Sequence, residues 1–141
     1  MAISKILNMK DCGGHFHGKH LKRALDYVMN PEKTQGGRLV GAINCQVDTA
    51  FEQMKETKRK FGKIDKRQGY HIILSFKGNE VNPDTAFEIS QKFVQEYLGR
   101  SYEAVFVVHD NTAHVHSHIV FNSVSFVDGK KYRYEKGDWA K

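Results

Sequence analysis

The stretch that decides the fold of this chain is residues 102–123, which read YEAVFVVHDNTAHVHSHIVFNS. Two runs rich in β-branched and aromatic residues, Tyr102–His109 and His114–Ser123, stand on either side of a short polar turn. Runs of this composition are typical of strands, and a short connection between two strands favours antiparallel pairing. The sequence therefore predicts an antiparallel hairpin at this point.

Before the hairpin, strand patterns and helix patterns alternate along the chain. Strands are expected at Ala2–Asn8, Arg38–Cys45 and Gly69–Phe76. Helices are expected over Lys19–Asn30, from a cap at Asp48 to Gly62, and from a cap at Asn82 to Gly99. A last strand pair is expected around Asp128–Gly129. The order β-α-β-α-β-α-β-β predicts an α+β fold, with helices covering one face of a mainly antiparallel central sheet.

Composition limits the class of protein. The 141 residues suit one domain, residues 1–141, and 22 Lys+Arg against 16 Asp+Glu give a net charge of +6. No apolar run approaches the ~20 residues of a membrane span, and the first residues lack the apolar stretch of a signal peptide. We expect a cytoplasmic protein, and the charged tail around Trp139 suggests the N-terminal part of a longer chain. Charge alone admits nucleic acid, an acidic membrane face or mere solubility.

Histidines alternate along the second run of the hairpin. His114, His116 and His118 share one face of the predicted strand with Asn122, opposite a mainly apolar face. Side chains two residues apart on a strand are rooted ~6.5–7 Å apart, so His116 and His118 can converge on one metal ion. His109 ends the neighbouring strand, a tight turn away, and is the third candidate ligand. Three neutral imidazoles leave coordination positions open, which is typical of a catalytic metal site.

The alternative is that these histidines are polar surface residues of a sheet, and for any single histidine that interpretation is the better one. Four histidines between His109 and His118, three of them in strict alternation, favour the metal site. His114 has the right face but starts the strand, so it is the weaker ligand.

The histidine segment resembles the third motif of conjugative relaxases of the mobilisation-nuclease type. That motif has a histidine, then after several residues His-x-His, and an asparagine four residues later; His109, His116, His118 and Asn122 match it. Residues 25–34, LDYVMNPEKT, look like the first motif of the same family, and residues 75–80, SFKGNE, are similar to its middle motif.

The resemblance implies a histidine-hydrophobic-histidine relaxase fold with a ferredoxin-like core. It implies that Tyr27 is the nucleophile and that His109, His116 and His118 bind Mn²⁺ or Mg²⁺. The implied activity is metal-dependent nicking and rejoining of one DNA strand at a transfer origin, through a covalent 5′-phosphotyrosine. The supporting residues that we expect near the site are Asn122, Asp110, His114, Glu80 and His20. By itself Tyr27 is also compatible with a boundary tyrosine that packs its ring on the sheet.

Basic residues gather between Lys55 and Arg67, and Arg23 adds another on the first expected helix. We expect the following residues to contact DNA: Arg23, Lys55, Lys58, Arg59, Lys60, Lys63, Lys66 and Arg67. The alternative is a solvated helix face. The partners that the resemblance implies are single-stranded DNA at a transfer origin, accessory nicking proteins and a coupling protein, without membrane insertion.

Two other functions stay open. One is a rolling-circle replication initiator of the same superfamily, although those initiators usually place the tyrosine after the histidine pair and Tyr27 precedes it. The other is a non-catalytic basic module that binds nucleic acid. Sequence preference on DNA depends on base contacts, which none of these motifs reports.

Overall fold

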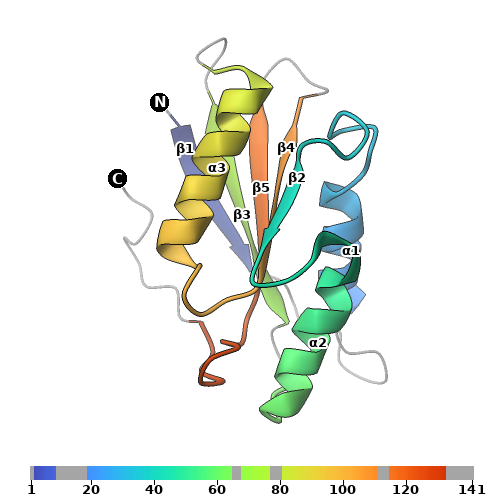
Figure 1. Ribbon diagram of the computed structural model, residues 1–141, viewed down its shortest axis with the longest axis vertical. Helices are drawn as coiled ribbons and strands as arrows, with labels where there is room; N and C mark the ends of the chain where they lie inside the picture. The colour runs from blue at the N-terminus through green and yellow to red at the C-terminus, as the bar shows by residue number, and fades with distance from the viewer. Residues whose placement is uncertain (1, 9–18, 65–67, 77–80, 111–114, 133–141) are drawn as a thin grey trace.

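A computed structural model describes residues 2–8, 19–64, 68–76, 81–110 and 115–132 of the chain (Figure 1). The strands are β1 (Ala2–Asn8), β2 (Val40–Ile43), β3 (Gly69–Phe76), β4 (Ala104–His109) and β5 (His116–Asn122). The helices are α1 (Lys19–Val28), the short 3₁₀ turn η1 (Val47–Thr49), α2 (Ala50–Lys60) and α3 (Pro83–Tyr97). The predicted order of strands and helices is confirmed for the described residues up to the end of β5.

The five strands form one antiparallel sheet in the order β1-β3-β5-β4-β2. The predicted hairpin is its core: β4 pairs with β5, and Ala104 lies opposite Phe121 while His109 lies opposite His116. β3 flanks β5 on the other side and places Ser75 opposite His116. The histidine end of β5 is therefore enclosed by a strand on each side.

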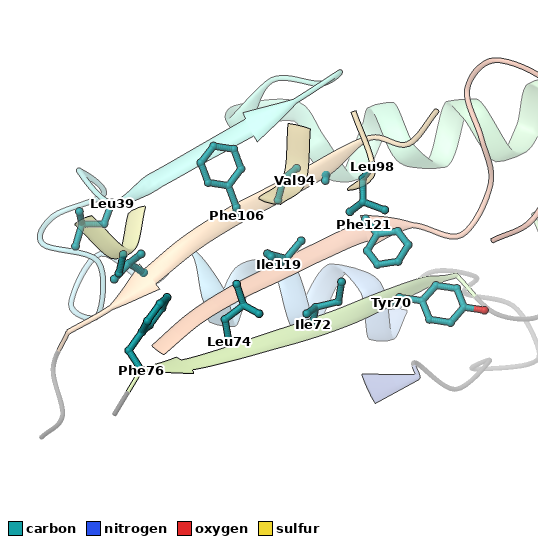
Figure 2. Close-up of a cluster of buried hydrophobic side chains, with 13 residues drawn as sticks. Leu39, Tyr70, Ile72, Leu74, Phe76, Val94, Leu98, Phe106, Ile119 and Phe121 are labelled. Atoms are coloured by element: carbon teal, nitrogen blue, oxygen red, sulfur yellow. The ribbon is translucent and has the colours of Figure 1, made fainter. Parts of the chain in front are cut away.

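Helices cover both faces of the sheet, not one as the sequence pattern suggested. On one face α3 packs on side chains such as Ile72, Phe106 and Ile119, which Figure 2 shows pointing to the same side of their strands. On the other face α1 and α2 pack on Val105, Val107 and Val120. β4 reflects this two-sided covering. Every one of its residues is buried, so neither of its faces is exposed to solvent.

Several helix and strand ends differ from the expectation. Asp48, the expected cap of the second helix, lies within the 3₁₀ turn η1, and Thr49 is the cap of α2. α1 ends at Val28 and not at Asn30, because Pro31 disfavours helical backbone at the residue before it. Around Asp128 the described chain forms a turn closed by a single bridge between Val124 and Lys131, and not a strand pair. Gly129 adopts a φ of +75° in that turn, a conformation that suits glycine.

No helix among the described residues has the length and apolar character that crossing a membrane requires.

Candidate functional site

Tyr27 lies in the last turn of α1, at the border between the buried and the exposed side of that helix. Leu25 and Val28 are buried against the sheet, whereas Tyr27 keeps 52% of its surface exposed. Its ring meets two histidine rings edge-on, with centroids 5.8 Å from His109 and 6.4 Å from His118. The fold thus brings an accessible phenol to the histidine end of the central hairpin.

The histidines come from two adjacent strands. His109 ends β4 and His118 is the third residue of β5, and their ring centroids lie 4.3 Å apart. His116 begins β5 directly opposite His109. His116 and His118 are two residues apart on one strand, so they share the face that carries α1.

Each of the two paired histidines is held by a further hydrogen bond. His109 Nε2 lies 2.8 Å from the carbonyl oxygen of Val28, one of the carbonyl groups that the end of α1 leaves without a helical partner. A carbonyl only accepts, so Nε2 of a neutral His109 carries the proton and Nδ1 keeps a lone pair. His118 Nδ1 lies 2.8 Å from His71 Nε2. The other ring nitrogen of His118, Nε2, takes no part in that hydrogen bond.

The protonation state of the cluster follows from burial. Burial, followed by the neighbouring His109 and His71, lowers the pKa of His118 to about 3. Burial and then His109 lower the pKa of His71 to about 4. Burial also lowers the pKa of His109. Near pH 7 these imidazoles are neutral, and the neutral imidazole is the form that binds a metal ion.

The histidine nitrogens suit a divalent metal ion, but they do not converge on one point. Metal-bound histidines commonly donate their second N–H to a carbonyl or similar acceptor, as His109 does to Val28. Among the described side chains, however, no three from His, Cys, Asp and Glu stand close enough together to hold one ion. A site formed by His109, His116 and His118 therefore requires these side chains to come closer together than they stand here.

Two residues of the site were not found by sequence reasoning. His71 is not among the predicted site residues, yet its Nε2 lies 2.8 Å from His118 Nδ1. Lys33 was not considered, yet its ammonium lies 4.7 Å from the centroid of the Tyr27 ring and 3.5 Å from the Tyr27 oxygen. The available signal was its place in the first motif, where Asn30-Pro31 turns the chain back toward the helix it has just left.

The supporting residues near Tyr27 are placed differently from the expectation. Asp110 supports the turn that holds Lys33, because its N–H donates to the Lys33 carbonyl at 3.2 Å and its carboxylate accepts from Gln35. His20 precedes Tyr27 by two helical turns, about 10 Å along the axis at ~1.5 Å per residue, so it is too far away to serve as its base. Arg23 is exposed one turn before Tyr27.

Asn122 lies away from the histidines, contrary to the prediction that it supports a ligand or substrate. It ends β5, about 13 Å along the strand from His118 at ~3.3 Å per residue. Its side chain is fully buried; Oδ1 accepts from Lys58 at 2.6 Å, and Nδ2 donates to Glu103 at 2.9 Å and to the Met54 carbonyl at 3.0 Å. Asn122 therefore bridges two buried ionisable groups between α2 and the sheet.

Lys58 does not belong to the predicted DNA surface, because only 2% of it is exposed. It follows Met54 by one helical turn and so shares the inward side of α2, which a count of positive charges cannot reveal. Lys55, Arg59 and Lys60 are exposed, and Lys63 is half-buried and bonded to the Gly129 carbonyl.

The exposed basic residues of α2 lie toward its end, where Lys58 meets Asn122 at the end of β5, and not beside Tyr27. The remaining candidates lie outside the described residues; they are His114, Glu80, Lys66 and Arg67.

The buried Lys58 predicts a pH dependence of stability. Burial lowers its pKa from 10.5 to about 7, against an opposing contribution from Glu103. The folded state thus binds this proton more weakly than the unfolded chain does, so the free energy of unfolding rises as pH increases from about 7 toward 10.5. Between pH 7 and 9 we expect a gain of roughly 2 kcal/mol in urea denaturation. The Lys58→Met variant should lack it, and an equal gain in that variant would contradict the assignment.

Comparisons with known proteins agree with the motifs. Residues 27–141 match the family model described as "Relaxase: MobA/VirD2-like, nuclease domain". The chain is 33% identical to a "Protein rlx" of Staphylococcus aureus over 118 residues, which cover 84% of this chain and 34% of that protein. It is 30% identical over 146 aligned positions to the "Group II intron-interrupted relaxase LtrB" of Lactococcus lactis subsp. cremoris, covering 85% of this chain and 25% of that protein.

The chain thus spans about a third or less of the length of these relatives. The family model nevertheless covers most of the chain and includes Tyr27 and all the histidines of the site described above. The chain belongs to the MobA/VirD2-like relaxase family, and it carries that family's nuclease domain.

Proposed function

We propose that this domain nicks and rejoins one strand of DNA at a transfer origin, with Tyr27 as the nucleophile. The observation that carries the proposal is the half-exposed Tyr27 ring set against His109 and His118. A tyrosine that only packed on the sheet would bury its ring and would have no need of a histidine cluster beside it. The domain would thereby start the mobilisation of a plasmid or an integrative element.

The proposed reaction is a transesterification that conserves the number of ester bonds. The Tyr27 oxygen forms a bond to the phosphorus, and the bond from phosphorus to the 3′ oxygen breaks. The phenol loses its proton and the departing 3′ oxygen gains one, which leaves a 3′ hydroxyl and a 5′-phosphotyrosine. The reverse attack by a 3′ hydroxyl rejoins the strand without ATP.

We propose that His109, His116 and His118 hold a divalent ion, Mn²⁺ or Mg²⁺. Such an ion would supply neutralisation of the charge on the scissile phosphate oxygens. The neutral imidazoles and the Val28 carbonyl behind His109 support this assignment. Because His109 also bonds the end of α1, the same side chain would fix the distance between the metal site and Tyr27.

The proposal is tested by covalent capture. The chain is incubated with Mn²⁺ and single-stranded oligonucleotides that tile the DNA flanking its gene, and the products are separated on a denaturing gel. We expect one oligonucleotide to give an adduct of protein and DNA, with the attachment mapped by mass spectrometry to the peptide that contains Tyr27. An adduct on another residue would refute the assignment of Tyr27, and binding without any adduct would favour the non-catalytic module.

We expect His116→Ala to weaken Mn²⁺ binding by more than ~10-fold, because it removes one of three ligands. Calorimetric titration with Mn²⁺ measures the effect, and His20→Ala serves as a control on the same side of the sheet but two helical turns from Tyr27. DNA affinity without metal should change little. Undiminished Mn²⁺ affinity in His116→Ala would remove it from the ligand set.

The exposed basic residues of α2 are proposed as contacts to DNA phosphates. Replacing Lys55 or Lys60 by Gln should each reduce the salt dependence of single-strand binding by about 0.7 in the slope of log affinity against log salt. Lys92→Gln, on the exposed side of α3, and the buried Lys58→Met are controls that should leave the slope unchanged. Fluorescence anisotropy over a salt series measures this slope. Equal slopes in all four variants would show that Lys55 and Lys60 do not contact the DNA.

The accessory nicking proteins and the coupling protein stay predictions from the family resemblance.

A further inference from the structure

We propose that Lys33 is a further catalytic residue, whose ammonium contacts the Tyr27 oxygen and stabilises the negative charge on it during strand cleavage and rejoining. The inference rests on the proposed role of Tyr27 as nucleophile. It assigns to the domain a protein-borne cation at the reacting oxygen, separate from the ion that the histidines would hold.

The Lys33 ammonium lies close to both the oxygen and the ring of the Tyr27 phenol. Lys33 Nζ lies 3.5 Å from the Tyr27 oxygen, at the outer limit of a hydrogen bond, and 4.7 Å from the ring centroid. The ring thus has a cation next to it and meets the His109 and His118 rings in edge-to-face geometry. A cation beside a ring and near its oxygen is attracted to the neutral phenol and more strongly to an oxygen that carries charge.

The backbone around Lys33 is fixed, so the contact does not depend on a loose loop. The Lys33 N–H donates to the Asn30 carbonyl at 3.0 Å, and the Lys33 carbonyl accepts from Asp110 at 3.2 Å. The next residue, Thr34, is fully buried and its hydroxyl donates to the same Asn30 carbonyl. The turn is therefore tied both to the end of α1 and to the residue that follows β4.

In the described part of the chain, no carboxylate forms an ion pair with the Lys33 ammonium. Among the residues that the structure describes, the ion pairs involve other cations, Lys22, Arg38 and Arg59. Asp110, whose backbone N–H bonds the Lys33 carbonyl, directs its carboxylate to Gln35. The positive charge of Lys33 also reaches the cluster, where it is one of the smaller influences that lower the pKa values of His109 and His118.

This placement matches the demands of both directions of the reaction. In cleavage, negative charge on the phenol oxygen has to be stabilised before its bond to phosphorus is complete. In rejoining, the same oxygen leaves the phosphorus with its electron pair, and the ammonium can donate a hydrogen bond to it as the bond breaks. A charge-assisted bond that is strongest when the oxygen is charged lowers the barrier rather than tightening DNA binding.

The first test measures the Tyr27 oxygen directly and without DNA. The chain is treated with N-acetylimidazole, and acetylation of the Tyr27 and Tyr97 peptides is followed by mass spectrometry, with hydroxylamine used to distinguish tyrosine esters from lysine amides. Tyr97 is an internal reference because it is exposed to a comparable degree, 41% against 52% for Tyr27. We expect Lys33→Gln to slow acetylation of Tyr27 relative to Tyr97 by about tenfold, and Lys33→Arg to restore most of the rate.

The second test uses the oligonucleotide captured by the unaltered chain. Lys33→Gln should lower the single-turnover cleavage rate by about 10- to 100-fold while DNA affinity changes less than about threefold, and Lys33→Arg should recover much of the rate. Lys22→Gln is the matched control, an exposed lysine on α1 paired with Asp26. It should alter neither measurement.

The outcomes separate this inference from the proposed function. If Lys33→Gln leaves the acetylation of Tyr27 unchanged, or lowers DNA affinity as much as the cleavage rate, Lys33 is a phosphate contact or a structural residue and the inference is wrong. If the unaltered chain gives no adduct at all, the proposed function fails, whereas the acetylation result still shows whether Lys33 activates the Tyr27 oxygen.

Discussion

The Tyr27→Phe variant is expected to lose strand cleavage by at least ~10³-fold, and to form no covalent adduct with DNA. The substitution removes the single oxygen that would bond to phosphorus and leaves the ring in place. Cleavage is measured under single-turnover conditions with the oligonucleotide captured by the unaltered chain. No other described tyrosine lies against His109 and His118, so no second phenol is placed to substitute for it.

The loss should be chemical and not structural. The described partner of the Tyr27 hydroxyl is the long contact with Lys33, and half of the side chain is exposed, so the free energy of unfolding should change by less than about 0.5 kcal/mol. Tyr97→Phe is the matched control, since it removes a partly exposed phenol from α3, on the other face of the sheet. Cleavage by Tyr27→Phe at the unaltered rate would eliminate Tyr27 as the nucleophile.

The Asn122→Ala variant is expected to lower the free energy of unfolding by about 3 kcal/mol. Its side chain bonds Lys58 and Glu103, and burial of the latter raises the pKa of its carboxyl. Truncation leaves both ionisable groups buried without their shared partner and opens a cavity where the carboxamide stood. Urea denaturation at constant pH measures the loss.

The same variant distinguishes the two interpretations of Asn122. If it bridges Lys58 and Glu103, Mn²⁺ affinity measured below the unfolding transition should stay within about twofold of the unaltered chain. If it supported the histidine cluster, as the motif alone suggested, Mn²⁺ affinity and cleavage would fall while stability changed little. That second pattern would contradict the bridging role that its hydrogen bonds indicate.

The sequence was sufficient to predict the structure wherever the interacting residues are close along the chain. The Tyr102–Ser123 region predicted the β4–β5 hairpin, because strand patterning and a short turn are local properties. The same periodicity put His116 and His118 on one face, since alternation on a strand has a period of two. The histidine segment, together with the motif that contains Tyr27 and the middle motif, predicted the family, which the comparisons confirm.

Only the tertiary structure decided which distant groups meet. Periodicity shows that Lys58 and Asn122 each lie on one side of an element, but not that those sides face each other across α2 and β5. It likewise could not place Lys33 at the Tyr27 oxygen, because that contact depends on a turn anchored to Asp110 at the end of β4. Residue types and spacing determine the chemistry that a segment offers, whereas the packing of helices on a sheet decides which of those groups share a site.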